Sequence, residues 1–119
     1  MKKTLVIGAS PNPDRYAYLA TEMLKEYKHP VYAFGLKKGL INGTEIQTEW
    51  PVNEDFDTVT LYVGSQNQAD YFSRVVNLKP KRVIFNPGTE NKEFENLLTQ
   101  NNIEPIEACT LVMLRTNQY

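Results

Sequence analysis

The sequence contains only one cysteine, Cys109, and only one histidine, His29. A single thiol cannot form a disulfide within the chain, which is typical of proteins from a reducing compartment. Metal centres and Cys–His catalytic pairs need several such side chains close together, and no cluster of His, Cys, Asp or Glu has that spacing. We therefore expect no metal site and no catalytic residue, and the sequence favours a binding protein over an enzyme.

An excess of one charge and long apolar runs are also missing. Thirteen Lys and Arg face 14 Asp and Glu, for a net charge of −1, so no basic surface for nucleic acid or for a membrane is indicated. The apolar runs at residues 4–7 and 82–85 are far shorter than the roughly 20 residues that cross a bilayer. The start of the chain lacks the apolar region of a signal peptide. We expect a cytoplasmic protein that binds neither nucleic acid nor a membrane.

The residues that are present predict one α/β domain over residues 1–119. The chain is 41% hydrophobic, which is enough for a core, and short apolar strands alternate with helical patterns. Such alternation is typical of parallel βαβ units, so we expect a Rossmann-like, open, mostly parallel sheet with helices on both faces. The predicted strands are residues 4–7, 31–34, 59–63, 82–85 and 103–108, with a short strand near 44–47. The predicted helices are residues 14–28, 68–78 and 90–101, with a closing turn at 110–114.

The first predicted helix carries its apolar residues at helical spacing. This pattern places Tyr16 in the core, on the same face as Leu19, Ala20 and Leu24. Arg15 is expected in the first helical turn.

Ligands of parallel α/β sheets bind outside the carboxyl ends of the strands, near the point where the strand order reverses. The loops that follow the predicted strands therefore hold the candidate binding residues. These residues are Gly8, Ala9, Ser10, Pro13, Arg15, Gly35, Lys37, Lys38, Gly64, Ser65, Asn86, Pro87 and Gly88.

The loop after the first strand has the residues of a phosphate-binding turn. Gly8 lets the backbone approach a ligand, and Ser10 adds a hydroxyl. The helix that follows directs free N–H groups to the same place, and Arg15 supplies a charge that suits a phosphate. A tight turn beside a solvated arginine is the alternative, and the position of the loop favours binding.

The loop after the second strand narrows the class of nucleotide. A dinucleotide fingerprint would have glycines at the positions of Ser10 and Pro13, and an acidic residue at the end of the second strand for the ribose hydroxyls. The chain instead has Lys37 and Lys38 there. Two cations suit a ribose that carries an extra phosphate, as in NADP or coenzyme A (CoA). Two solvated lysines of a surface loop remain the other interpretation.

The order of these residues resembles that of small stand-alone CoA-binding proteins, which are similar to the N-terminal domain of the succinyl-CoA synthetase alpha subunit. The resemblance is carried by Val6-Ile7-Gly8-Ala9-Ser10, Pro13-Asp14-Arg15, Lys37, Asn86-Pro87-Gly88 and Cys109. It implies a Rossmann-like domain whose first loop takes the CoA diphosphate. It also implies that Lys37 lies near the 3′-phosphate and that Asn86 to Gly88 approach the pantetheine arm.

The chain departs from the pattern of that family at several positions. Gly35-Leu36 stands where the family usually has Asn-Pro, Ala17 where it often has Ser, and Gly64 where it has Arg. The predicted function is non-catalytic binding of CoA or an acyl-CoA, with a sensing or regulatory role. Two alternatives stay open, an NADP-binding oxidoreductase-like protein and a protein-interaction domain that has lost its ligand.

Cys109 follows the last predicted strand and has two interpretations. Free cysteines are commonly buried in a core, and this is the favoured interpretation. A position at the ligand edge would instead bring Cys109 near the thiol of CoA, as a redox-sensitive contact.

Overall fold

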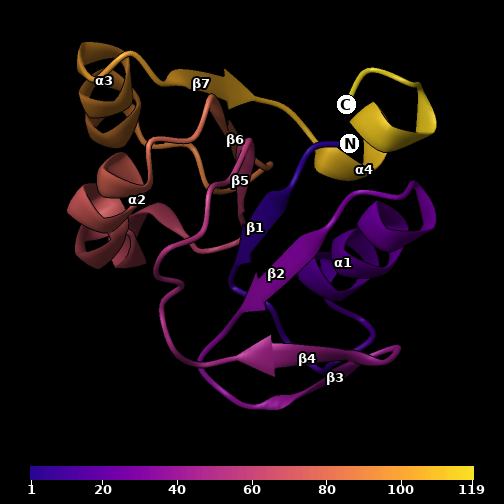
Figure 1. Ribbon diagram of the computed structural model, residues 1–119. Coiled ribbons are helices and arrows are strands. Elements are labelled where there is room, and N and C mark those ends of the chain that lie inside the picture. The colour runs from indigo at the N-terminus through magenta and orange to yellow at the C-terminus, as the bar shows by residue number, and fades with distance from the viewer.

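Seven strands form one sheet in the computed structural model, which describes residues 1–119 (Figure 1). The strands are β1 (Thr4–Ile7), β2 (Val31–Phe34), β3 (Gly39–Ile41), β4 (Thr44–Gln47), β5 (Thr58–Leu61), β6 (Arg82–Phe85) and β7 (Glu104–Glu107). The spatial order is β3-β4-β2-β1-β5-β6-β7, and only the β3–β4 pair is antiparallel. The expected open, mostly parallel sheet is confirmed.

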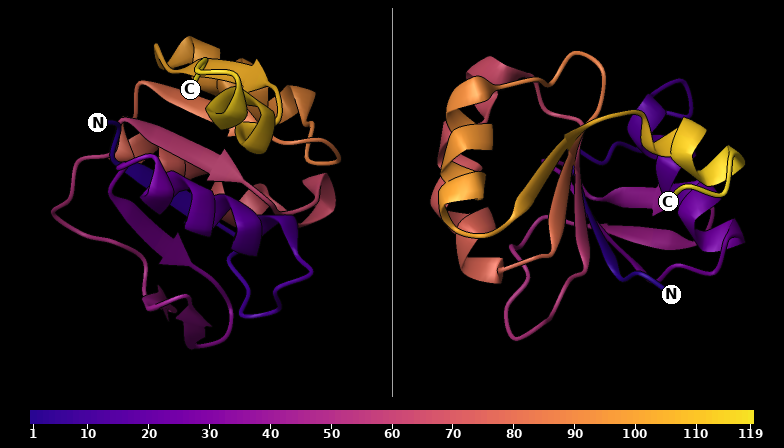
Figure 2. Two further views of the ribbon diagram at one scale, coloured as in Figure 1. Left: turned by 90° about the vertical axis from the view of Figure 1, so that its right-hand side faces the viewer. Right: turned by 90° about the horizontal axis from the view of Figure 1, so that it is seen from above.

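Helices cover both faces of this sheet (Figure 2). They are α1 (Tyr16–Glu26), α2 (Phe72–Leu78), α3 (Lys92–Gln100) and α4 (Thr110–Arg115), and two short 3₁₀ helices, η1 (Ser65–Asn67) and η2 (Ala69–Tyr71), precede α2. Side chains of β1 alternate between the faces, because successive strand residues point in opposite directions. Leu5 and Ile7 pack in the core under α2 and α3, whereas Val6 packs with residues of α1 and α4.

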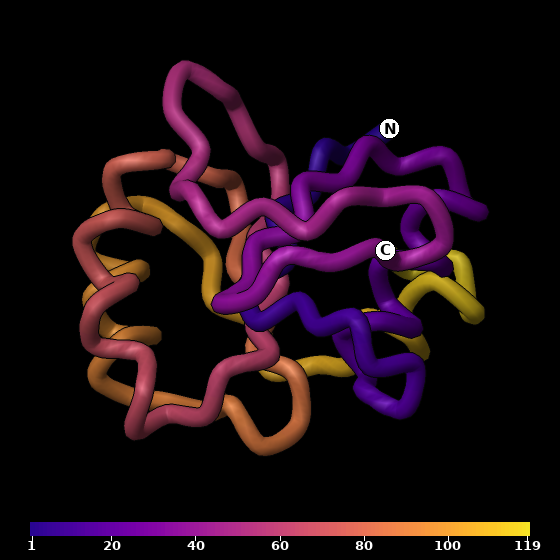
Figure 3. Tube along the Cα trace, turned by 90° about the horizontal axis from the view of Figure 1, so that it is seen from below, coloured from indigo at the N-terminus to yellow at the C-terminus, as the bar shows by residue number.

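The central strands are buried on both faces because helices cover both sides of the sheet. All four residues of β1 are buried, as are all four of β5. Ile7 pairs with Phe34 of β2 on one side and with Leu61 of β5 on the other. The chain therefore moves outward from β1 in one direction and later in the opposite direction. Figure 3 looks onto the edge where these parallel strands end and their loops diverge.

Helix α1 differs from its predicted position. It begins at Tyr16, and Arg15 is its extended N-cap residue (φ −85°, ψ 141°) rather than part of the first turn. The buried face carries Ala17, Ala20, Thr21 and Leu24, while Tyr16 is 70% exposed. The prediction that Tyr16 lies in the core was wrong. Two helical stripes of apolar residues overlap in this segment, one beginning at Tyr16 and one at Ala17. The stripe that begins at Ala17 has the smaller side chains, and these let α1 pack closely on the sheet.

Residues 39–47 form a hairpin of which only the second strand was predicted. Asn42 and Gly43 connect β3 to β4 with positive φ angles of 46° and 88°. An Asn-Gly pair of this kind is typical of a two-residue hairpin turn, because its twist matches that of the strands. The hairpin adds an antiparallel edge to the sheet.

The start of α3 contains a carboxyl group with an altered pKa. The Glu95 side chain is 11% exposed, and its Oε2 accepts a hydrogen bond from the backbone N–H of Asn91, the N-cap residue, at 3.3 Å. Burial, followed by the hydrogen bond with the neighbouring Glu107 carboxyl, raises the pKa of Glu95 above its ordinary value of 4.5. The folded state therefore binds a proton at Glu95 more strongly than the unfolded chain does.

Replacing Glu95 with glutamine should raise the free energy of unfolding at pH 7. A raised folded-state pKa stabilises the protein fully below the unfolded pKa, near 4.5, and this stabilisation is lost as the pH rises through the folded pKa. Glutamine stays neutral and keeps an acceptor for Asn91. Urea unfolding from pH 4.5 to 8 should thus give a flatter profile for Glu95→Gln than for wild type. Glu93→Gln, at an exposed position of the same helical turn, is the control, and parallel profiles for all three proteins would contradict the prediction.

Candidate ligand-binding site

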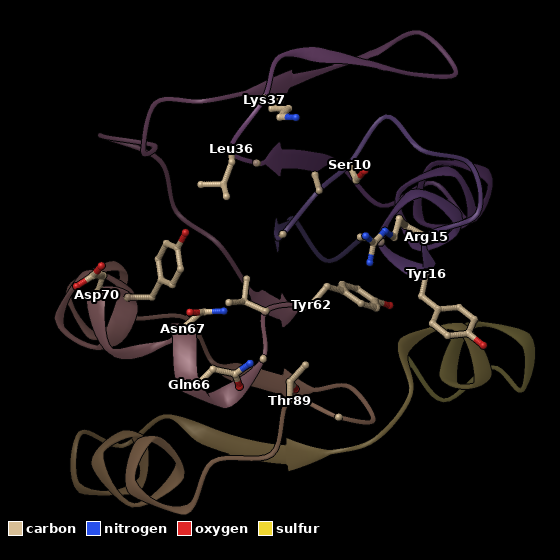
Figure 4. Close-up of a pocket in the computed structure, with 18 of the residues that line it drawn as sticks. Ser10, Arg15, Tyr16, Leu36, Lys37, Tyr62, Gln66, Asn67, Asp70 and Thr89 are labelled. Atoms are coloured by element: carbon tan, nitrogen blue, oxygen red, sulfur yellow. The ribbon is translucent and has the colours of Figure 1, made fainter.

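A cavity of about 1070 Å³ opens at the edge where the parallel strands end. The loops after β1, β2, β5 and β6 supply its walls, and Figure 4 shows most of the lining side chains. The candidate residues that line it are Gly8, Ala9, Ser10, Arg15, Gly35, Lys37, Gly64, Pro87 and Gly88. Pro13, Lys38, Ser65 and Asn86 are not part of the lining.

Two glycines let the loops pack against each other through their backbones. Gly8 has a φ of +99°, and a Cβ there would lie 2.9 Å from the Tyr62 carbonyl oxygen. A Cβ on Gly35 would lie 2.3 Å from the Ala9 carbonyl oxygen. The N–H groups of Gly8 and Ala9 both donate to the Phe34 carbonyl, at 3.0 and 2.9 Å. Their donors are therefore occupied within the protein.

Some of the other backbone donors of the first loop are bonded within the protein and some are free. The N–H of Asp14 donates to the side-chain oxygen of Asn12, and the N–H of Arg15 donates to the backbone carbonyl of Asn12, each at 3.0 Å. The N–H groups of Ser10, Tyr16 and Ala17 have no hydrogen-bond partner in the protein, and all three residues line the cavity. Free N–H groups at the start of a helix favour an anion, because the helix dipole adds to their partial charges.

The charged side chains of the lining are Arg15, Lys37 and Asp70. Arg15 and Lys37 are exposed and form no salt bridge. Figure 4 shows Arg15 and Tyr16 on one side of the cavity and Asp70, Asn67 and Leu36 on the other. The site therefore has Arg15 on one side and, on the other, a carboxylate together with an exposed apolar side chain.

Asn86 lies beneath the cavity and connects elements of the fold. It is 2% exposed, and its Nδ2 donates to Thr60 Oγ1 at 2.6 Å and to the Leu61 carbonyl at 2.8 Å. Its Oδ1 accepts from the N–H of Thr110 at 2.9 Å. One amide thus joins β5, β6 and the start of α4. The neighbouring Pro87 and Gly88 reach the cavity, whereas the Asn86 side chain is used within the protein.

Tyr62 and Cys109 lie near this buried polar group. Tyr62 lines the cavity, yet its hydroxyl is buried and has no hydrogen-bond partner. Burial, with a smaller effect from Cys109, raises the pKa of Tyr62 above its ordinary value of 10.0. Cys109 is the N-cap residue of α4, is only partly buried and does not line the cavity.

The segment after β5 contributes residues that were not predicted for the site. Gln66, Asn67, Asp70 and Tyr71 line the cavity from η1 and η2. The sequence pattern predicted one helix from residue 68, and only residues 72–78 form an α-helix. The position of the whole segment after a parallel strand is the signal that could have included it.

The only histidine lies at the opposite edge of the sheet. His29 Nδ1 accepts a hydrogen bond from the backbone N–H of Lys2 at 3.0 Å, and its ring packs on Tyr119 with centroids 4.8 Å apart. No group of three or more His, Cys, Asp or Glu in the structure is placed to hold a metal ion. None of the helices has the length and the apolar character that a membrane crossing requires.

Comparison with known proteins adds a family to this geometry. The family model described as CoA binding domain matches residues 2–115. The crystal structure of an uncharacterized protein is 54% identical, with a TM-score of 0.96 over 100% of this chain and 98% of that chain. A protein from Thermus thermophilus is 22% identical, with a TM-score of 0.83 over 99% of this chain and 91% of that one.

A larger enzyme contains a domain of the same fold. The dinucleotide-forming acetyl-coenzyme A synthetase 1 of Ca. Korarchaeum cryptofilum is 14% identical, with a TM-score of 0.73 over 89% of this chain and 25% of the enzyme. No curated protein matches the chain. The family match extends over nearly the whole sequence, including every loop that lines the cavity, and the chain belongs to the CoA-binding domain family.

Proposed function

We propose that this chain is a single-domain cytoplasmic protein that binds CoA or an acyl-CoA without catalysing a reaction, in a sensing or regulatory role. The observation that carries the proposal is the free N–H groups of Ser10, Tyr16 and Ala17 beside the Arg15 guanidinium at one cavity. Membership of the CoA-binding domain family supports CoA as the nucleotide.

The residues of the cavity fit the parts of a CoA molecule. The free N–H groups and Arg15 would hold the diphosphate, since charge-assisted hydrogen bonds to phosphate are strong. Lys37, in the loop after β2, would contact the 3′-phosphate of the ribose. Gly88 has a φ of +93° and open space where a Cβ would lie, so a pantetheine arm could pass close to the backbone there.

The titratable groups of the cavity support a binding role. The lining contains Arg15, Lys37, Asp70 and three tyrosines, and neither His29 nor Cys109 contributes to it. A general base must lie within hydrogen-bond reach of the proton that it removes. The Tyr62 hydroxyl is buried and its pKa is raised, so it is a poor base near neutral pH.

The Lys37→Ala variant should bind CoA about tenfold more weakly, which corresponds to the loss of one charge-assisted contact. Its affinity for dephospho-CoA, which lacks the 3′-phosphate, should fall less than about threefold by the same reasoning. Isothermal titration calorimetry with CoA, dephospho-CoA, NADP and NAD measures these differences. Lys38→Ala is the matched control, because Lys38 is the next residue and does not line the cavity.

The same titrations test the alternatives. Preference of the wild-type protein for NADP over CoA would reject CoA and support an oxidoreductase-like protein. Failure of all four nucleotides to bind would reject the proposal in favour of a protein-interaction domain.

A further inference from the structure

Asp70 is a carboxylate in the wall of a cavity that otherwise favours anions. It is exposed and forms no salt bridge. A ligand with several phosphates gains nothing from an unpaired carboxylate, because like charges repel. The carboxylate contributes to binding only if it accepts a hydrogen bond from a part of the ligand that is not a phosphate.

Residues on the same side of the cavity as Asp70 form a surface for a flat ring. Tyr71 lines the cavity and stacks on Trp50, with centroids 5.9 Å apart and the planes 27° from parallel. Phe34 meets both rings edge-on, at 5.2 and 6.1 Å, so the position of Tyr71 is well supported. Leu36 lines the same cavity and is 87% exposed. Large apolar side chains exposed at a cavity are typical of a binding surface.

Within the cavity, this surface lies apart from Arg15 and the free N–H groups that would bind the diphosphate. Figure 4 shows Leu36, Asn67 and Asp70 on the side opposite Arg15, with Lys37 above Leu36 in this view. A nucleotide whose diphosphate lies at the N-terminal end of α1 and whose ribose phosphate lies at Lys37 would extend its base toward Leu36 and Asp70.

We infer that Asp70 is a specificity-determining residue that accepts a hydrogen bond from the exocyclic amino group of the ligand's adenine base. This inference rests on the proposed function, because it assigns the base of the same nucleotide. The base would lie against Leu36 and Tyr71, and the Asp70 carboxylate would select a ring that carries N–H donors. A site built around such a hydrogen bond discriminates against ligands that cannot form it, since the acceptor then loses its partner.

A CoA analogue without these donors tests the inference. In 1,N6-etheno-CoA the exocyclic nitrogen belongs to an added ring and carries no hydrogen, while all phosphates are retained. The wild-type protein should bind CoA about tenfold more tightly than etheno-CoA, as one charge-assisted hydrogen bond predicts. In Asp70→Ala this ratio should fall below about threefold, because the acceptor is gone. Asp70→Asn keeps a neutral acceptor and should give an intermediate ratio.

The controls separate this role from others. Asp55→Asn removes an exposed carboxylate that does not line the cavity and should leave the ratio unchanged. Asp70 also lies in the first turn of η2, just before α2, where a carboxylate stabilises a helix. A lowered melting temperature of Asp70→Ala with an unchanged ratio would assign only that structural role and overturn the inference. Equal wild-type affinities for CoA and etheno-CoA would also overturn it and leave CoA binding intact, whereas failure of both to bind would reject the proposed function as well.

Discussion

Replacing Gly35 with alanine is expected to lower the free energy of unfolding by about 3 kcal/mol, the upper range for a group forced into a packed site. The new Cβ would lie 2.3 Å from the Ala9 carbonyl oxygen and 3.0 Å from the Ile46 side chain. The nearest atom belongs to the backbone, so no side-chain rotation can relieve the contact. Ala9 is held by its hydrogen bond to Phe34, and Gly35 itself donates to the Gln47 carbonyl at 3.0 Å.

The same substitution should also weaken CoA binding by more than tenfold. Relief of the contact must displace the loop after β1, which carries the free N–H of Ser10, and binding groups lose affinity when they are misplaced. Urea denaturation and calorimetry at a temperature where the variant is folded measure the two effects.

Gly43→Ala is the control for Gly35→Ala. Gly43 has a φ of +88°, but no atom lies within 4 Å of its would-be Cβ. Gly43→Ala should therefore lower the free energy of unfolding by only about 1 kcal/mol, the strain of a non-glycine residue in the left-handed backbone region. Equal costs at the two positions would show that the close approach of Gly35 to Ala9 is not what excludes a side chain.

Replacing Asn86 with alanine is expected to destabilise the protein by about 3–4 kcal/mol. The variant loses three buried hydrogen bonds and leaves the Leu61 carbonyl and the Thr110 N–H without partners. An unsatisfied buried polar group costs about 1–3 kcal/mol, and the truncation also leaves a space. Asn86→Asp should be no better, because it keeps the acceptor for Thr110 but places a charge against the Leu61 carbonyl.

Chemical denaturation of the two Asn86 variants tests this structural role. Asn77→Ala, at an exposed position of α2, is the control and should change the free energy of unfolding by less than about 0.5 kcal/mol. Asn86 variants as stable as wild type, with a selective loss of CoA affinity, would instead assign the side chain to the ligand.

The mostly parallel sheet and the edge that holds the site follow from local sequence patterns. Strands buried on both faces are rich in apolar and β-branched residues, and β1, β5 and β6 are therefore visible as short runs dominated by such residues. Alternation with helices makes the strands parallel, and parallel strands end at one edge. The loops at Gly8, Gly35, Gly64 and Gly88 could thus be placed at one edge of the sheet without a structure.

The direction of individual side chains within those loops was decided only by tertiary contacts. Tyr16 and Ala17 fit the helical period equally well, and the close packing of α1 on the sheet turned Ala17 inward. Asn86 follows a strand as a ligand residue would, but its amide found partners in Thr60 and Thr110, which are distant in the sequence. Periodicity and position describe one segment at a time, whereas burial and hydrogen bonding depend on segments that meet only when the chain has folded.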